Sequence, residues 1–507
     1  MKIFKSSQVA GIDAYTITQE PILSINLMER AAQACTDWIA KKYDIKHKFV
    51  VFVGIGNNGG DGLAIARQLA VCGYSVEVYV LKLVDELVND PLINYKWLIQ
   101  IPEVKVHDLH AYDELPKLKD DAIIIDALFG SGLTRPVTGF AADIISFIND
   151  SKLSVISIDI PSGLFGEDNS TLYSNKEAKI VEANITLTLQ QPNLSFFLSD
   201  NERYIGEWYI IPIGLHSGAI EESTTSWFYL DSEYIKTIYK KRKKFSHKGT
   251  YGHGLLFAGS YGMMGAAVLT AKAAIKSGIG LLTAHVPRLG VEILQTALPE
   301  SLVSIDQSDI LVSEHPALSK YNAVAFGPGV GQKQNTYKCL HSVLKDVNYP
   351  LVIDADGLNL FSVHPEILDE IHPKTILTPH PKEFDRMFGD SKNAYARLQK
   401  QVEMAEKYNV YIVLKGAHSS VACPDGRVFF NSSGNPGMAT GGSGDVLTGI
   451  ILSLLAQGYE PEGACKLGVY IHGLAGDFAA ELESLEAVSA SDIINCLGKA
   501  FTNILES

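Results

Sequence analysis

Residues 49–72 read FVVFVGIGNNGGDGLAIARQLAVC: an apolar run, a glycine-rich loop and a segment with helical spacing. A short apolar run followed by a helical pattern predicts a buried strand that leads through a loop into a helix. The same alternation recurs along the chain, which favours an α/β fold with parallel sheets covered by helices on both faces. In such sheets, ligands bind at the carboxyl ends of the strands.

Further apolar runs and helical patterns extend this prediction over the whole chain. In the first half we expect strands at 49–53, 75–81, 122–126 and 153–159, and helices at 63–72 and 140–148. In the second half we expect strands at 255–258, 281–286, 323–326, 351–354 and 410–414, and helices at 266–277 and 446–456.

Length and composition indicate a globular chain of more than one domain. The chain has 507 residues, 46% of them apolar and 20% charged, which excludes a disordered chain, a collagen and a coiled-coil rod. A polar stretch at 216–226 predicts two domains, 1–225 and 226–507. The net charge is -14, and residues 1–225 hold 18 basic against 29 acidic residues. Such acidity argues against nucleic acid as the main partner.

The sequence also indicates the cellular compartment in which we expect the protein. No apolar run approaches the roughly 18 residues needed to span a bilayer, and the first residues lack the apolar core of a signal peptide. The six cysteines are scattered without a CxxC pair. We therefore expect a cytoplasmic protein with reduced thiols and no membrane partner.

The first glycine-rich loop, GIGNNGGDG at 54–62, contains the motif G-x-G-x-x-G on Gly54, Gly56 and Gly59. That motif is typical of a dinucleotide site, but alone it is a weak signal. The loop adds oxygen-bearing side chains that suit a cation, on Asn57, Asn58 and Asp61. A tight turn that needs left-handed glycines is the structural alternative.

Two further predicted strands end in carboxylates. Asp126 opens DALFGSG (126–132) and Asp159 opens DIPSG (159–163). A single strand-end Asp is often only a helix cap or turn former. Three such loops at one edge of a parallel sheet predict a shared cleft.

The motifs GNNGGDG, DALFGSG and DIPSG, with NLMERA at 26–31, resemble the NAD(P)H-hydrate epimerase family over roughly residues 1–215. The resemblance implies a Rossmann-like fold with a potassium ion held by Asn58, Asp126 and Ser162. It implies that Asp159 is the acid/base residue that interconverts the C6 epimers of hydrated NADH or NADPH (NADHX or NADPHX). It also implies that Asp159 binds this substrate together with Asn57, Asn58, Gly59, Gly60, Asp61, Gly130, Ser131, Gly132, Leu133, Thr134, Arg135 and Pro136.

In the second half, GNPGMATGGSGDVLTG at 434–449 places three glycines before an apolar helical segment. A helix N-terminus exposes unpaired N–H groups, and glycines let phosphate oxygens approach them. Asp445 lies at the mouth of this anion site, where a carboxylate can take a proton from an attacking hydroxyl. A glycine-rich helix cap is the structural alternative.

Other motifs in this half follow predicted strands: GPGVG at 327–331, DAD at 354–356, TPHP at 378–381 and KGAHS at 415–419. Lys415 at such a strand end could meet a phosphate or ribose. A basic run at 240–244 reads as a solvated linker, with attraction of an anionic nucleotide as the alternative.

These motifs, with HKGTYG at 247–252, resemble the ADP/ATP-dependent NAD(P)H-hydrate dehydratase family, a ribokinase-like fold, over roughly 230–500. The resemblance implies that the hydrated cofactor contacts Ala266, Gly329, His380 and Asp445. It implies that ADP or ATP, with Mg²⁺, contacts Lys415, Gly416, Ala417, His418, Ser419 and Gly444. Two departures from the family pattern are Lys382 after TPHP and Met263-Met264 before GAA.

With both halves present, we expect an enzyme that epimerises NADHX or NADPHX and then dehydrates the S-epimer. The sequence leaves open ADP or ATP as donor and NADHX or NADPHX as preferred substrate. The family resemblance implies a homo-oligomer, a tetramer or larger. A ribokinase-like small-molecule kinase and a non-catalytic N-terminal binding domain are the alternatives.

Overall fold

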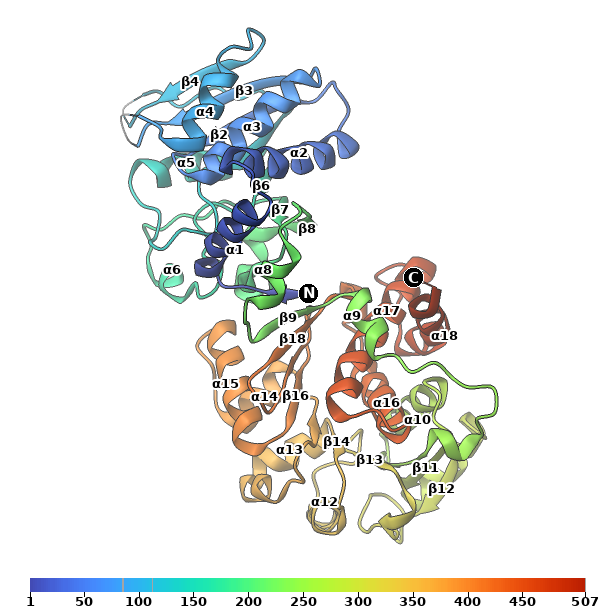
Figure 1. Ribbon diagram of the computed structural model, residues 1–507. Coiled ribbons are helices and arrows are strands. Elements are labelled where there is room, and N and C mark those ends of the chain that lie inside the picture. Colours follow the sequence, from blue (N-terminus) through green and yellow to red (C-terminus); the bar gives the residue numbers. More distant parts are fainter. Residues whose placement is uncertain (84–85, 112, 507) are drawn as a thin grey trace. The chain divides into compact units, whose positions relative to one another are not determined.

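The computed structural model describes residues 1–83, 86–111 and 113–506 (Figure 1). The chain forms two compact units. The N-terminal unit comprises Lys2–Thr225 with Asn393–Tyr395, and the C-terminal unit comprises Met1, Ser226–Lys392 and Ala396–Ser507. Each unit has its own sheet and its own apolar clusters.

The N-terminal unit contains a sheet with the order β4-β3-β2-β5-β6-β7-β8, in which every neighbouring pair is parallel. Its strands are β2 (Lys48–Val53), β3 (Ser75–Leu81), β4 (Lys105–Leu109), β5 (Ala122–Ala127), β6 (Ser154–Ile158), β7 (Ile185–Leu189) and β8 (Glu207–Ile211). The predicted strands at 49–53, 75–81, 122–126 and 153–159 are thereby confirmed to within a residue or two.

Helices cover both faces of this sheet, because alternate strand residues point to opposite sides. Val51 and Val53 pack in one apolar cluster with residues of α2 and α3, whereas Val50 and Phe52 pack in another with residues of α5. The short strand β1 (Lys2–Ile3) opens the chain, and the helices are α1 (Ser6–Gln19), α2 (Ser24–Lys42), α3 (Asn57–Val71), α4 (Asn89–Leu98), α5 (Phe140–Asp150), α6 (Ser170–Ser174), α7 (Glu202–Ile205) and α8 (Ser217–Glu222).

Helix α3 begins earlier than the sequence predicted. It starts at Asn57 and not at Leu63, so most of the presumed glycine-rich loop forms its first turns. None of the glycines of this segment has a positive φ. All except Gly56 serve close packing instead: a Cβ on Gly59, for example, would lie 2.0 Å from the Gly54 carbonyl oxygen. The alternative of a turn built on left-handed glycines is therefore wrong.

The C-terminal unit contains strands in the order β9-β18-β17-β16-β15-β14-β13-β10-β11-β12. The strands are β9 (Trp227–Leu230), β10 (His253–Phe257), β11 (Leu281–Val286), β12 (Leu302–Ile305), β13 (Ala323–Phe326), β14 (Leu351–Ile353), β15 (Ile376–Leu377), β16 (Tyr411–Leu414), β17 (Ser420–Ala422) and β18 (Val428–Asn431). Neighbours from β16 to β12 pair in parallel, as predicted. Strand β17 instead runs antiparallel to both β16 and β18.

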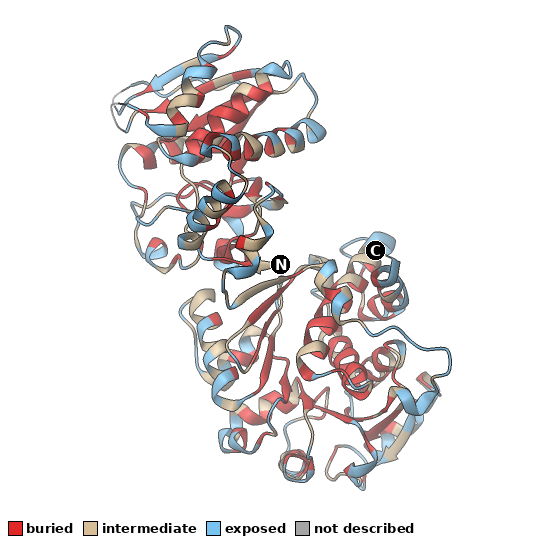
Figure 2. Cartoon of the chain, viewed as in Figure 1, coloured by how far each residue is buried: buried red, intermediate tan, exposed pale blue. Residues whose placement is uncertain are grey.

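Helices α10, α16, α17 and α18 enclose the main apolar cluster of this unit, and α16 has buried residues over nearly its whole length. Buried residues in Figure 2 gather in the central strands and in the helices packed on them. The helices are α9 (Ser232–Ile238), α10 (Met264–Lys276), α11 (Val291–Ala297), α12 (Gln334–Asp346), α13 (Asp356–Val363), α14 (Pro381–Phe388), α15 (Ala394–Tyr408), α16 (Ser443–Ala456), α17 (Pro461–Glu483) and α18 (Ala490–Glu506).

Two general features complete the description. Within the described ranges, no helix is both long enough and apolar enough to cross a membrane. All six cysteines are free thiols; five are buried, and Cys72, which follows the last residue of α3, is exposed.

Candidate functional sites

The carboxyl edge of the N-terminal sheet holds Asp126, which is fully buried at the end of β5. One carboxylate oxygen accepts from the Ser162 hydroxyl at 2.5 Å, and the other from the Ser162 backbone N–H at 2.9 Å and the Ser157 hydroxyl at 2.8 Å. Burial raises the pKa of Asp126, while these hydrogen bonds oppose the rise. Asp126 therefore joins the ends of β5 and β6 and fixes Ser162 beside them.

Asp159 follows β6 with a left-handed φ of 66° and accepts the Ser131 backbone N–H at 2.7 Å. A Cβ on Gly130 would lie 2.9 Å from the Asp159 carboxylate, so a larger residue at position 130 would force a shift there. Burial raises the pKa of Asp159, which is the shift an acid/base residue needs. The structure thus brings Asp159 together with the start of the 130–136 loop.

Asn58 lies in the first turn of α3 and is only 7% exposed. Neither atom of its amide group has a hydrogen-bond partner among the described residues. A Cβ on Gly130 would lie 3.2 Å from the Asn58 Cβ, which places Asn58 beside Gly130 and Asp159. A buried amide without a partner is costly, so this one is suited to a ligand or cation.

The rest of the predicted epimerase set surrounds this point. Gly59 and Gly60 are buried in α3, Asn57 is exposed at its first residue, and Asp61 is half-buried. In the 130–136 loop, Gly132, Thr134 and Arg135 are exposed, while Ser131, Leu133 and Pro136 are half-buried. The exposed members can act only at the rim of a site centred on Asn58 and Asp159.

Sequence reasoning missed one acidic residue of this site, Asp13 in α1. Burial and the charge of Asp159 raise the pKa of Asp13 to about 6. Burial and the charges of Asp159, Asp13 and Asp90 also raise the pKa of Asp61 well above its usual range. Asp13 carries no local signal, because it lies in an ordinary helical segment far from the three motifs.

In the C-terminal unit, the N-terminus of α16 presents Asp445 in its first turn, after a left-handed Gly442 with φ of 89°. Burial and the negative charges of Asp354 and Asp356 raise the pKa of Asp445 to about 7, against the opposing charge of Lys415. A carboxylate with a pKa near 7 can accept a proton at neutral pH and release it again.

Lys415 directly follows β16 and lies beside the same helix terminus. Its ammonium donates to Asp354 at 2.9 Å, and Thr448 donates to the other Asp354 oxygen at 2.6 Å. Burial opposes the charge of Lys415, but the carboxylates of Asp354 and Glu383 raise its pKa overall. A Cβ on Gly444 would lie 3.3 Å from the Lys415 Nζ. A fixed positive charge thus adjoins the unpaired N–H groups of α16.

A cavity of about 480 Å³ opens in front of Asp445. Three residues predicted to contact the hydrated cofactor line it, Ala266, Gly329 and Asp445. It is also lined by Gly262, Met263, Gly265, Leu269, Ala355, Asp356, Asn359, Glu383, Gly441 and Gly442. Gly329 has φ of 66°, and a Cβ there would lie 2.8 Å from the Met263 carbonyl oxygen. Met263, one of the two departures from the family pattern, therefore belongs to the cavity wall.

His380 caps the N-terminus of α14 and does not line this cavity. Its Nδ1 accepts the backbone N–H groups of Lys382 and Glu383 at 3.1 and 3.2 Å. The Glu383 carboxylate accepts the His380 N–H at 2.9 Å in return. This capping box holds Glu383, which does line the cavity, in a fixed position.

The predicted nucleotide segment 415–419 forms the connection between β16 and β17. Gly416 and Ala417 are exposed, and Ser419 is half-buried. The His418 Nδ1 lies 3.1 Å from the Asn431 carbonyl oxygen. Within this segment, Lys415 lies beside the N-terminus of α16. Asp445, in the first turn of the same helix, belongs to the cavity wall.

Sequence reasoning also missed His472, which α17 places next to α16. Its Nε2 lies 3.2 Å from the Ser443 hydroxyl, and burial lowers its pKa to about 4. His472 is therefore neutral at physiological pH. Nothing in the local sequence indicates this contact with Ser443, because His472 lies inside a long, largely apolar helix.

Two family patterns match the chain. The one described as YjeF-related protein N-terminus matches residues 24–195, and the one described as NAD(P)H-hydrate dehydratase matches residues 254–499. Two curated relatives, both called bifunctional NAD(P)H-hydrate repair enzyme Nnr, span the whole chain. The protein of Moorella thermoacetica is 32% identical over 100% of this chain and 98% of its own length. That of Thermofilum pendens is 34% identical over 100% and 97%.

Solved structures resemble the C-terminal unit. A ribokinase-like superfamily protein from Enterococcus faecalis has a TM-score of 0.50 and 27% identity, and the match covers 56% of this chain and 98% of that one. The ADP/ATP-dependent NAD(P)H-hydrate dehydratase of Bacillus subtilis, co-crystallised with ATP and Mg²⁺, has a TM-score of 0.47 and 31% identity over 55% and 98%.

Fold and site together define a two-part α/β enzyme, in which a Rossmann-like unit precedes a ribokinase-like unit. Both expected fold classes are confirmed. The chain belongs to the family of bifunctional NAD(P)H-hydrate repair enzymes.

Proposed function

We propose that this chain restores hydrated NADH and NADPH in two steps. Residues 1–225 epimerise NADHX or NADPHX at C6, and residues 226–507 dehydrate the S-epimer with ADP or ATP. Family membership supports the pair of activities. The observation that carries the proposal is the placement of Asp445, whose pKa is about 7, at a helix N-terminus that faces a ligand-sized cavity.

Asp445 is the base of the dehydration. It takes the proton of the C6 hydroxyl, and that oxygen attacks the terminal phosphoryl group of the nucleotide. A bond from C6 oxygen to phosphorus forms, and AMP (from ADP) or ADP (from ATP) leaves. The C6–O bond then breaks with its electron pair on the departing phosphate. Loss of a proton from C5 restores the double bond.

The α16 terminus and Lys415 bind the phosphates. Three glycines, 441, 442 and 444, let phosphate oxygens approach the unpaired N–H groups of the helix, and the ammonium of Lys415 adds a fixed charge beside Gly444. Asp356 and Glu383 supply carboxylate oxygens in the cavity wall, and one or two such oxygens together with the phosphates suit Mg²⁺. When bound, Mg²⁺ supplies neutralisation of phosphate charge.

Asp159 is the acid/base residue of the epimerisation. It lies beside Asn58, and its pKa is raised by burial. The unpartnered Asn58 amide and the buried oxygens of Asp126 and Ser162 fit potassium, which prefers such uncharged and carboxylate oxygens. Bound there, K⁺ supplies a positive charge to organise the substrate loops.

The test uses the full chain with mixed NADHX epimers, K⁺, Mg²⁺ and either ADP or ATP, followed by the near-ultraviolet absorbance of NADH. We expect recovery of both epimers, and the faster nucleotide identifies the donor. Recovery that stops at the S-epimer contradicts the epimerase proposal and favours a binding role for the N-terminal unit. Phosphorylated substrate without release of phosphate contradicts the dehydratase and favours a small-molecule kinase. Light scattering tests the proposed assembly into a tetramer or larger.

A further inference from the structure

A second cavity lies next to the one that contains Asp445. Its volume is about 370 Å³. It is lined by Tyr261, Gly262, Met264, Gly265, Pro287, Leu289, Gly290, Ile293 and Asp309. Gly262 and Gly265 line both cavities, so they form a shared rim. A Cβ on either glycine would meet nothing within 4 Å, which leaves open space for a ligand that crosses from one cavity to the other.

The wall of the second cavity exposes large apolar side chains. Tyr261, Leu289 and Ile293 are 75%, 55% and 48% exposed. Single exposed apolar residues are common, but three around one concavity indicate a binding surface. A flat ring between Tyr261 and the aliphatic side chains of Leu289 and Ile293 would remove this apolar area from water.

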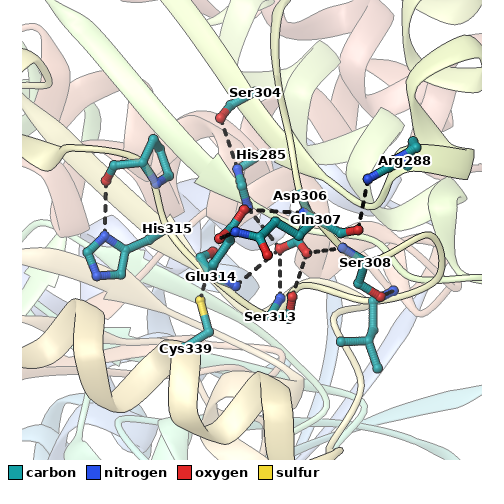
Figure 3. A network of polar contacts seen from close by, with 12 residues as sticks. His285, Arg288, Ser304, Asp306, Gln307, Ser308, Ser313, Glu314, His315 and Cys339 are labelled. Carbon is teal, nitrogen blue, oxygen red and sulfur yellow. Dashed lines mark hydrogen bonds and ion pairs between the residues drawn. The ribbon is translucent and has the colours of Figure 1, made fainter.

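One residue of the cavity wall, Asp309, belongs to a loop that the buried network in Figure 3 holds in place. Asp306, 1% exposed, accepts the backbone N–H groups of Ser308 and Ser313 at 2.8 and 2.7 Å and pairs with His285 Nε2 at 3.0 Å. The loop held in this way carries Asp309, which lines the cavity, and Ile310 next to it. The Tyr261 N–H donates to the Ile310 carbonyl oxygen at 2.8 Å. The cavity is therefore preformed, which favours tight binding.

The charged side chain in the cavity wall determines which chemical groups of a ligand can bind there. Among its described lining residues, Asp309 alone is charged, and its carboxylate lies 3.5 Å from the Arg288 Nε. A carboxylate accepts N–H and O–H groups but repels phosphate. Apolar walls with one acceptor suit a purine ring with its amino group and ribose hydroxyls, and do not suit a polyphosphate chain.

We propose that this second cavity binds the adenosine half of the hydrated dinucleotide, while the reacting ring lies at Asp445. The inference rests on the proposed dehydratase function. The shared rim immediately precedes Ala266, on the side proposed for the hydrated cofactor. The phosphoryl donor is proposed to lie on the other side of the α16 terminus, at Lys415 and Gly444. The diphosphate of the dinucleotide crosses the rim at Gly262 and Gly265.

The test compares two S-epimer substrates in the full chain: hydrated NADH and the hydrated form of reduced nicotinamide mononucleotide, which lacks the adenosine half. The variants are Tyr261→Ala, which removes the stacking surface, and Ile293→Trp, which fills the cavity. Ile305→Trp is the control, because Ile305 is 55% exposed but does not line the cavity. The assay measures kcat and KM for both substrates and for ADP or ATP.

We expect both variants to raise KM for hydrated NADH by about tenfold, the loss that one stacked base causes. We expect kcat, the KM of the short substrate and the KM of the nucleotide donor to match those of the control. A raised KM for the donor would assign the cavity to the nucleotide and overturn the proposal. An unchanged KM with a changed oligomeric state in light scattering would also overturn it and assign the surface to a second copy of the chain. If the unaltered enzyme converts neither substrate, the dehydratase proposal itself is wrong.

Discussion

At the scale of single residues, Asp445 sets the pH range of the proposed dehydration. Its pKa of about 7 means that it is protonated, and unable to accept the C6 proton, in mildly acidic solution. We expect kcat/KM for the S-epimer to fall tenfold per pH unit below pH 7. Asp445→Asn should lower kcat by about 10²- to 10⁴-fold and remove this dependence. A pH profile that is unchanged in the variant would show that another group is the base.

We predict that the charged carboxylate of Asp13, which lies in the proposed epimerase site, lowers the free energy of unfolding. An acid whose pKa rises from 3.8 to about 6 on folding favours the folded state at low pH, and that advantage disappears as pH rises through this range. Asp13→Asn should therefore increase the free energy of unfolding at pH 8 by up to about 3 kcal/mol and leave it nearly unchanged at pH 3.

Urea unfolding of the full chain at both pH values measures this effect. Asp37→Asn, at an exposed position of α2, is the matched control and should change stability at neither pH. A variant that is less stable at pH 8 would mean that Asp13 makes favourable contacts that outweigh its charge.

The sequence revealed those site residues that stand beside apolar runs and glycines. Asp126 and Asp159 lie at the ends of buried strands, and Asp445 lies at the start of an apolar helix. Asp13 and His472 lie within helices, and nothing in their local pattern distinguishes them from surface or core positions. Only tertiary packing brings them to the sites, so sequence periodicity could not identify them.

At the scale of elements, the first turns of α3 depend on the absence of side chains. Gly59→Ala would place a Cβ 2.0 Å from a backbone oxygen, which cannot move as a flexible side chain can. We expect a loss of about 2–3 kcal/mol in stability and loss of epimerisation. Gly56→Ala is the control, because a Cβ there meets nothing within 4 Å and the φ of -94° suits alanine.

Thermal unfolding and the epimerase assay on both variants test this prediction. Equal effects of the two substitutions would contradict it, since they would indicate that helix propensity and not close packing decides the outcome.

Elements with continuous apolar runs were predictable, and two others were not. The segment 57–62 read as a loop because glycine and asparagine disfavour helices, but burial against β2 and β5 overrides that preference. Strand β17 runs antiparallel to both β16 and β18 through short connections, and a short apolar strand carries no mark of its direction.

At the scale of the whole molecule, each unit carries its own core and its own site. If the S-epimer leaves the first site as a free small molecule, two chains with different defects should complement each other. We expect Asp159→Asn to convert only the S-epimer and Asp445→Asn to convert neither. Their mixture should recover NADH from both epimers.

The same absorbance assay measures this recovery, with each variant alone as the control. If the mixture recovers no more than Asp159→Asn alone, the two steps must occur within one chain.

One exposed thiol allows a fluorescent dye to be attached near the proposed epimerase site. Cys72 is the one exposed cysteine of six, and it follows the helix whose first turn holds Asn58. With 15 residues at 1.5 Å each, a maleimide dye there would lie about 22 Å from that turn. That separation is short enough for energy transfer to a fluorescent nucleotide and long enough to leave the site undisturbed. The unaltered chain can thus be labelled at a single position, and ligand arrival can be followed in real time without engineering a new cysteine.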